Sequence, residues 1–149
     1  MQSLLQILTE LSPQILETLH FRKIADRFEP NMMDYSHVDF ENPELRVRFF
    51  RDRFEISLNF GSVMEPDVWW DEGEVWTLIG IVIDRSVRDQ ERIQITNVCS
   101  LLESNYASIV TLFGSQKYEQ TKIQMLDGRR QAILEFNRKA RARSNAFHR

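Results

Sequence analysis

Residues 45–60 constrain the fold of this chain more than any other stretch, because apolar and polar side chains alternate there in two runs. The apolar residues of 45–49 alternate with arginine, and those of 54–60 alternate with polar residues. A period of two is typical of a strand with one buried face and one face in water. The two runs are separated by about four residues, so the sequence predicts an antiparallel hairpin that turns near Asp52 and Arg53.

Other periodic patterns precede and follow this hairpin. Leucine and isoleucine recur every three or four residues in 4–19, and Pro13 interrupts them, which predicts one kinked helix or two short ones. The stretches 24–28 and 35–40 predict one or two further strands beside the hairpin. Residues 75–83 have a helical apolar stripe and are predicted to be a helix, with a buried strand as the alternative because many are β-branched.

The C-terminal half is predicted to be a pair of helices. One apolar face extends over residues 89–113 and ends before Gly114, a residue typical of helix ends. A second helix is predicted from about Lys117, with 127–128 as a point where it could break. Residues 138–149 are basic and polar, and we expect them to fray.

Together these patterns predict an α+β fold in one domain, residues 1–149. A small antiparallel sheet, made of the hairpin at about 45–60 and one or two further strands, would pack against the N-terminal helix and the C-terminal helical pair. A chain of 149 residues buries roughly 68–70% of its unfolded surface, so it can fold without disulfides or a structural metal.

Charge is distributed unevenly along the chain. Residues 1–75 carry 15 acidic and 7 basic side chains, whereas residues 129–149 carry 1 acidic and 7 basic ones. The net charge of −3 therefore combines an acidic body with a basic tail. No apolar run approaches a membrane span, the first residues lack the basic region of a secretory signal, and the single Cys99 fits a reducing compartment. These features predict a cytoplasmic protein.

An acidic loop with adjacent tryptophans, within residues 65–76, is the predicted partner-binding site. Tryptophan is enriched at interface hot spots, and carboxylates around it would steer a basic partner onto the loop. The residues assigned to this site are Asp67, Trp69, Trp70, Asp71 and Glu72. In the alternative interpretation, the tryptophans close the core between sheet and helices, while the acidic side chains face water.

The sequence contains no recognisable catalytic or phosphate-binding motif. Asp34, His37, Asp39 and Glu41 are the one candidate metal cluster, but one histidine among acidic residues is common on a solvated strand. Cys99 lies on the apolar face of the best helix, where an inert buried thiol is expected. We therefore predict no metal, no cofactor and no enzymatic activity.

The order of elements, with a strand reading Leu-Arg-Val-Arg-Phe-Phe-Arg-Asp-Arg at 45–53 and a tryptophan-rich acidic step after the next strand, resembles a broad group of small, largely uncharacterised bacterial proteins. Some of that group are similar to immunity proteins, which neutralise polymorphic toxins. The resemblance covers about residues 44–80 and implies a protein-binding role, but it assigns no functional residue.

Three functions follow in order of preference. The first is a non-enzymatic binding protein of the immunity or toxin-antagonist type, which occludes a basic partner with its acidic aromatic face. The second is a nucleic-acid-associated accessory protein that uses the basic tail, where clustered arginine would neutralise phosphates. The third is a hydrolase without a recognisable motif.

Overall fold

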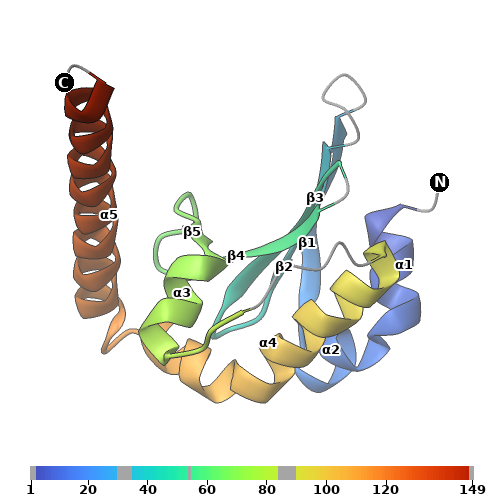
Figure 1. Ribbon diagram of the computed structural model, residues 1–149. Helices are drawn as coiled ribbons and strands as arrows, with labels where there is room; N and C mark the ends of the chain where they lie inside the picture. The colour runs from blue at the N-terminus through green and yellow to red at the C-terminus, as the bar shows by residue number, and fades with distance from the viewer. Residues whose placement is uncertain (1–2, 30–34, 54, 84–89, 148–149) are drawn as a thin grey trace.

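The computed structural model describes residues 3–29, 35–53, 55–83 and 90–147. The chain is an α+β protein in which helices cover one face of an antiparallel sheet (Figure 1). In sequence order its elements are α1 (Leu4–Leu11), α2 (Pro13–Thr18), β1 (Arg22–Glu29), β2 (Tyr35–Glu41), β3 (Arg46–Asp52), β4 (Glu55–Gly61), β5 (Trp70–Asp71), α3 (Glu72–Ile79), α4 (Glu91–Phe113) and α5 (Tyr118–Phe147).

The five strands form one antiparallel sheet in which each strand pairs with its neighbour in sequence. The predicted hairpin is β3–β4, and the predicted strands at 24–28 and 35–40 are β1 and β2. Phe49 pairs with Leu58, and both are at most 2% exposed, whereas Arg48 points to the opposite side. We call the apolar side the core face and the side that carries Arg48 the open face.

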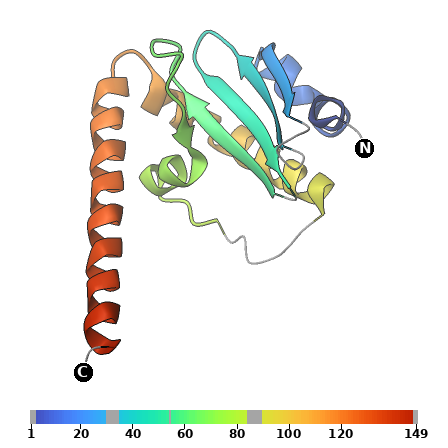
Figure 2. The ribbon, with the colours of Figure 1, turned by 90° about the horizontal axis from the view of Figure 1, so that it is seen from above.

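Helices α1, α2 and α4 cover the core face (Figures 1 and 2). Of the two predicted alternatives, one kinked helix or two short ones, the N-terminal region forms two short helices, because α1 ends at Leu11 and Pro13 begins α2. The long helix predicted before Gly114 is also confirmed as α4, and its Ile95 and Ile109 are completely buried against the core.

The stretch 75–83 is helical as far as Ile79 and contains no strand. The helix α3 begins after Asp71, whose carboxylate accepts the N–H of Gly73 at 2.7 Å. It ends at Gly80, which has a φ of +83°, a left-handed conformation that glycine adopts without steric cost. These two end signals override the strand preference of the β-branched residues between them.

The helix α5 differs from its sequence prediction. It continues through 127–128 and through the basic residues after Arg138 as far as Phe147, so the predicted break and the predicted fraying at 138 are not observed. One glycine inside a helix costs only about 1 kcal/mol relative to alanine, and most residues from 129 to 143 are strong helix formers. In the described part of the chain, no helix combines the length and the apolar composition needed to cross a membrane.

Candidate partner-binding surface

The acidic aromatic segment, residues 65–76, lies at the β5 edge of the sheet and includes most of α3. Trp70 in β5 pairs with Phe60 of β4 and points into the core, where it is 1% exposed. Trp76 is also 1% exposed. Trp69 precedes Trp70 by one residue, and its ring lies over open-face side chains of β3. Trp70 and Trp76 therefore belong to the core, as the alternative interpretation predicted, whereas Trp69 lies near the surface.

Two arginines of β3 support the indole of Trp69. The guanidinium carbon atoms of Arg46 and Arg48 lie 4.9 and 4.4 Å from the ring centroid of Trp69. Both arginines are fixed in turn, since Arg46 donates to the Pro66 carbonyl and Arg48 binds both carboxylate oxygens of Asp39 at 2.7 and 2.8 Å. The hydrogen bond with Asp39 raises the pKa of Arg48 against the opposing effect of burial. The tryptophan ring is thus held in place by cation–π contacts.

The sequence-predicted binding residues divide into surface and buried groups. Asp67 and Asp71 are exposed, and Trp69 is partly exposed. Trp70 donates its indole N–H to the Tyr118 hydroxyl at 3.2 Å, and Glu72 is 4% exposed. A partner can therefore reach Asp67, Trp69 and Asp71 directly, whereas Trp70 and Glu72 lie behind that surface.

Arg46 and Arg48 were not among the residues predicted from the sequence to form this site. Their alternation with apolar residues was a sufficient signal to place both on the wet face of β3. Their contact with Trp69 depends on how the loop after β4 returns to the sheet, and no local pattern encodes that return.

A second group of contacts attaches the start of α5 to the same segment. The Tyr118 hydroxyl donates to Glu65 at 2.8 Å, and the Lys122 ammonium lies 2.8 Å from the other oxygen of Glu65. These two hydrogen bonds, that of Lys122 first, lower the pKa of Glu65, and burial raises the pKa of the Tyr118 phenol. Two turns further on, Arg129 binds Glu74 through two nitrogens at 2.9 to 3.0 Å. The acidic segment therefore attaches the first turns of α5 to the rest of the protein; we call this end of the helix the base of α5.

The described side chains of the candidate metal cluster form ion pairs and hydrogen bonds with neighbouring side chains. The Nδ1 atom of His37 lies 3.2 Å from Asp39, whose two oxygens are already bound to Arg48. Glu41 forms ion pairs with arginines of the neighbouring strands, and Asp34 lies outside the described residues. Across those residues, no group of three His, Cys, Asp or Glu side chains is arranged to hold a metal ion.

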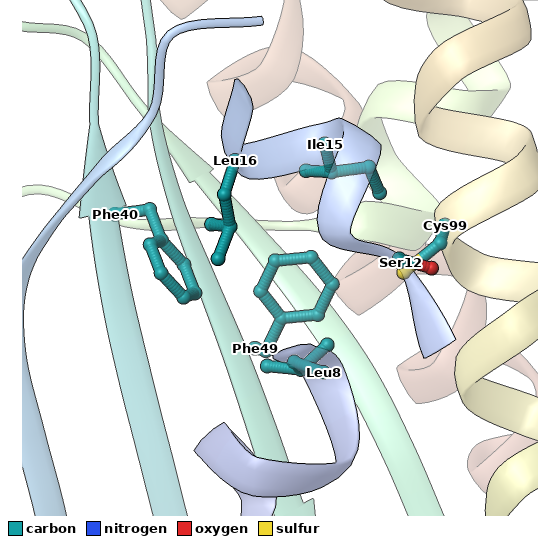
Figure 3. A pocket seen from close by; sticks show the side chains of 7 residues that line it. All are labelled: Leu8, Ser12, Ile15, Leu16, Phe40, Phe49 and Cys99. Atoms are coloured by element: carbon teal, nitrogen blue, oxygen red, sulfur yellow. The ribbon is translucent and has the colours of Figure 1, made fainter. Parts of the chain in front are cut away.

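A small cavity lies between the N-terminal helices, the sheet and α4 (Figure 3). Its volume of about 10 Å³ is close to the smallest that holds one water molecule. Cys99 borders this space and is 3% exposed, as its place on the apolar face of α4 predicted. Burial raises the pKa of the Cys99 thiol to about 11, so the neutral thiol dominates at neutral pH. The cavity residues are Leu8, Ser12, Ile15, Leu16, Phe40, Phe49 and Cys99.

Comparison of the chain with protein-family models, with curated proteins and with solved structures finds no match. Its function is therefore inferred from its own geometry.

Proposed function

We propose that this protein is a non-enzymatic binding protein that recognises a basic protein partner with a surface centred on Trp69. The partly exposed Trp69 ring, held over Arg46 and Arg48, is the observation that carries the proposal. A rigid aromatic ring loses little conformational freedom on binding, and such rings dominate the free energy of protein interfaces.

Charge favours a basic partner over an acidic one. Residues 61–76 contain five acidic side chains and no basic one. The two arginines below Trp69 are neutralised locally, Arg48 by Asp39 and Arg46 by Glu41 at 3.7 Å. The exposed carboxylates of Asp67 and Asp71 are then left to attract positive charge from outside.

A toxin antagonist of the immunity type is the specific role that we infer. Toxins that act on nucleic acid are often basic, and an acidic aromatic surface would occlude one by charge-steered docking. We place this role in the cytoplasm, where a chain with one free, buried thiol needs no oxidising environment.

The test is the affinity of the purified partner for the Trp69→Ala variant. We expect the affinity to fall at least about 30-fold, since truncating a hot-spot side chain costs about 2 kcal/mol or more. Ile93→Ala is the matched control, because Ile93 is 47% exposed and lies in the first turn of α4, outside the acidic segment. Equal affinity of a folded Trp69→Ala variant and the wild type would refute the site.

The second candidate function is binding of nucleic acid by the end of α5. Its support is the exposure of four basic residues in the described part of the tail, Arg138, Lys139, Arg141 and Arg143. Deleting residues 138–149 should then abolish retention of DNA or RNA, and retention should fall steeply as salt rises. The tail contains a single aromatic residue, Phe147, and so lacks a stacking platform for single strands.

A further inference from the structure

The last two-thirds of α5 is attached to the protein body, among the described residues, only near its start, where Arg129 binds Glu74 and lies over the Trp70 ring. Residues 127–147 are all exposed, and at 1.5 Å per residue they extend for about 32 Å. Both views show this part of α5 apart from every other element (Figures 1 and 2). Large apolar side chains lie along it, including Ile133 at 60% and Phe136 at 71% exposure. Helices gain most of their stability from packing an apolar face, so this helix has a face that another surface should cover.

Most of the large apolar residues of this part of α5 follow the spacing of a two-helix contact, although Leu134, at 54% exposure, lies beside it. From Leu126 to Phe147, seven positions are separated alternately by three and four residues over three heptads. Five of the seven side chains at these positions are apolar. We name this set the α5 seam: Leu126, Arg129, Ile133, Phe136, Ala140, Arg143 and Phe147.

The chain exposes more surface than a compact monomer of its mass. Such a monomer of 17.7 kDa exposes about 8,000 Å², whereas this chain exposes 9981 Å². The excess agrees with a helix whose last turns pack against no other element of the described chain.

Charge selects a second copy of this chain as the occupant. Near the base of α5 lie the exposed carboxylates of Asp67 and Asp71, whereas Glu65 and Glu74 of the acidic segment are already paired with Lys122 and Arg129 and Glu72 is buried. The far end of α5 carries four basic and no acidic residues in 138–147. An antiparallel arrangement brings the basic end of each copy to the acidic base of the other, whereas a parallel one brings like charges together. Nucleic acid is the poorer occupant, because an apolar seam offers nothing to phosphates and the acidic base repels them.

We propose that the α5 seam packs antiparallel against the same seam of a second copy in a two-fold dimer. In the register that opposes Ile133 to Phe136 of the second copy, Arg129 faces Ala140 and Leu126 faces Arg143, and Phe147 lies beyond the last of these pairs. Trp69 is not part of the seam, so the dimer goes beyond the proposed function, although the basic end of the second copy would lie near Asp67 and Asp71, which the proposed function assigns to the partner. The mass of the protein and its affinity for the partner test the two proposals separately.

Sedimentation velocity and light scattering on the full chain test the dimer. We expect a mass of 35.4 kDa, twice the 17.7 kDa of one chain. The double variant Ile133→Glu, Phe136→Glu should weaken dimerisation at least about 100-fold. The two-fold axis repeats both substitutions in the second copy, so four carboxylates would have to be buried in the interface. Both side chains are exposed in the single chain, so the helical circular dichroism signal should persist in the variant.

Ala142→Glu is the matched control, because Ala142 is exposed on the opposite side of α5 and the variant should remain a dimer. A wild-type mass of 17.7 kDa at about 100 μM, or equal masses for the seam variant and wild type, would overturn the proposal. A monomer that binds an oligonucleotide through residues 138–149 would overturn the dimer and identify α5 as a nucleic-acid-binding helix instead. The affinity of the seam variant for the partner of Trp69 is measured as well. Unchanged affinity in a monomeric variant would show that the dimer and the proposed function are independent.

Disulfide cross-linking tests the orientation. Leu126→Cys mixed with Arg143→Cys should form a cross-linked pair, and neither variant should cross-link with itself, since identical positions would lie about 25 Å apart along the axis. Self-cross-linking of either variant alone would show a parallel pair and refute the antiparallel arrangement. Cys99 does not interfere, because it is buried and its thiol has a pKa of about 11.

Discussion

Tyr118→Phe tests whether the contacts at the base of α5 hold this helix to the body. The Tyr118 hydroxyl accepts the indole N–H of Trp70 at 3.2 Å and donates to Glu65 at 2.8 Å. The ring of Tyr118 is 1% exposed and stacks on Phe113 with the centroids 6.0 Å apart, so phenylalanine preserves the packing and removes only the hydroxyl.

The expected cost comes mainly from the buried partner. The Trp70 N–H lies in the core and loses its acceptor, which costs about 1–3 kcal/mol. Loss of the bond to the partly exposed Glu65 adds about 0.5–1 kcal/mol. We therefore expect the free energy of unfolding to fall by about 1.5–4 kcal/mol, a large fraction of the ~5–15 kcal/mol typical of a domain.

Urea unfolding followed by tryptophan fluorescence measures this change, with the denaturant slope unchanged if unfolding remains two-state. Tyr35→Phe is the matched control, because the Tyr35 side chain is half-buried on the open face, and we expect a change within about 0.5 kcal/mol. A loss below about 0.5 kcal/mol for Tyr118→Phe would refute the role assigned to this hydroxyl.

Three other predictions concern charges and the buried thiol. Glu91→Gln should lower the free energy of unfolding by about 2 kcal/mol, because it removes the negative charge beside the Arg51 side chain, which is 4% exposed. The cost is less than for a fully buried ion pair, since the Glu91 side chain is partly open to water. An unchanged urea midpoint would contradict this. The pKa of Glu65 is lowered, chiefly by Lys122, so this ion pair stabilises the fold above the ordinary value of 4.5 and its contribution is lost as pH falls through the lower folded pKa. Lys122→Met should flatten that part of the stability–pH profile, and an unaltered profile would count against the pair. Because burial raises the pKa of Cys99 to about 11, stability should be independent of this thiol below about pH 9 and fall as pH rises from there towards 11; at about pH 8 a thiol reagent should react no faster than the protein unfolds.

The sequence predicted the elements that bury a regular face. Alternation over 45–60 gave β3 and β4, and the apolar stripe before Gly114 gave α4, because one side of each packs against the core. Pro13 correctly divided the N-terminal helices.

The elements that lack such a pattern could not be predicted. The strand β5 has two residues, which is too short to show a period, and without it Trp69 and Trp70 could not be assigned to opposite faces of the sheet. The length of α5 was underestimated after Arg138 because this part buries nothing, although its residues favour a helix individually.

The candidate site could be predicted only in part, because it depends on contacts between distant segments. The acidic, tryptophan-rich composition of 65–76 identified the segment, and Asp67, Trp69 and Asp71 lie at its surface. The support from Arg46 and Arg48 spans more than twenty residues and follows from the register of β4 and β5, which no local pattern determines.

Capture from a lysate of the source organism tests the proposed binding function most directly. The immobilised wild-type chain, Trp69→Ala and Ile93→Ala are each washed at low and then at high salt, and the retained proteins are identified. We expect one basic protein that survives the high-salt wash on wild type and Ile93→Ala and is absent from Trp69→Ala. The same retained proteins on all three columns, or nucleic acid alone that leaves at high salt, would contradict it.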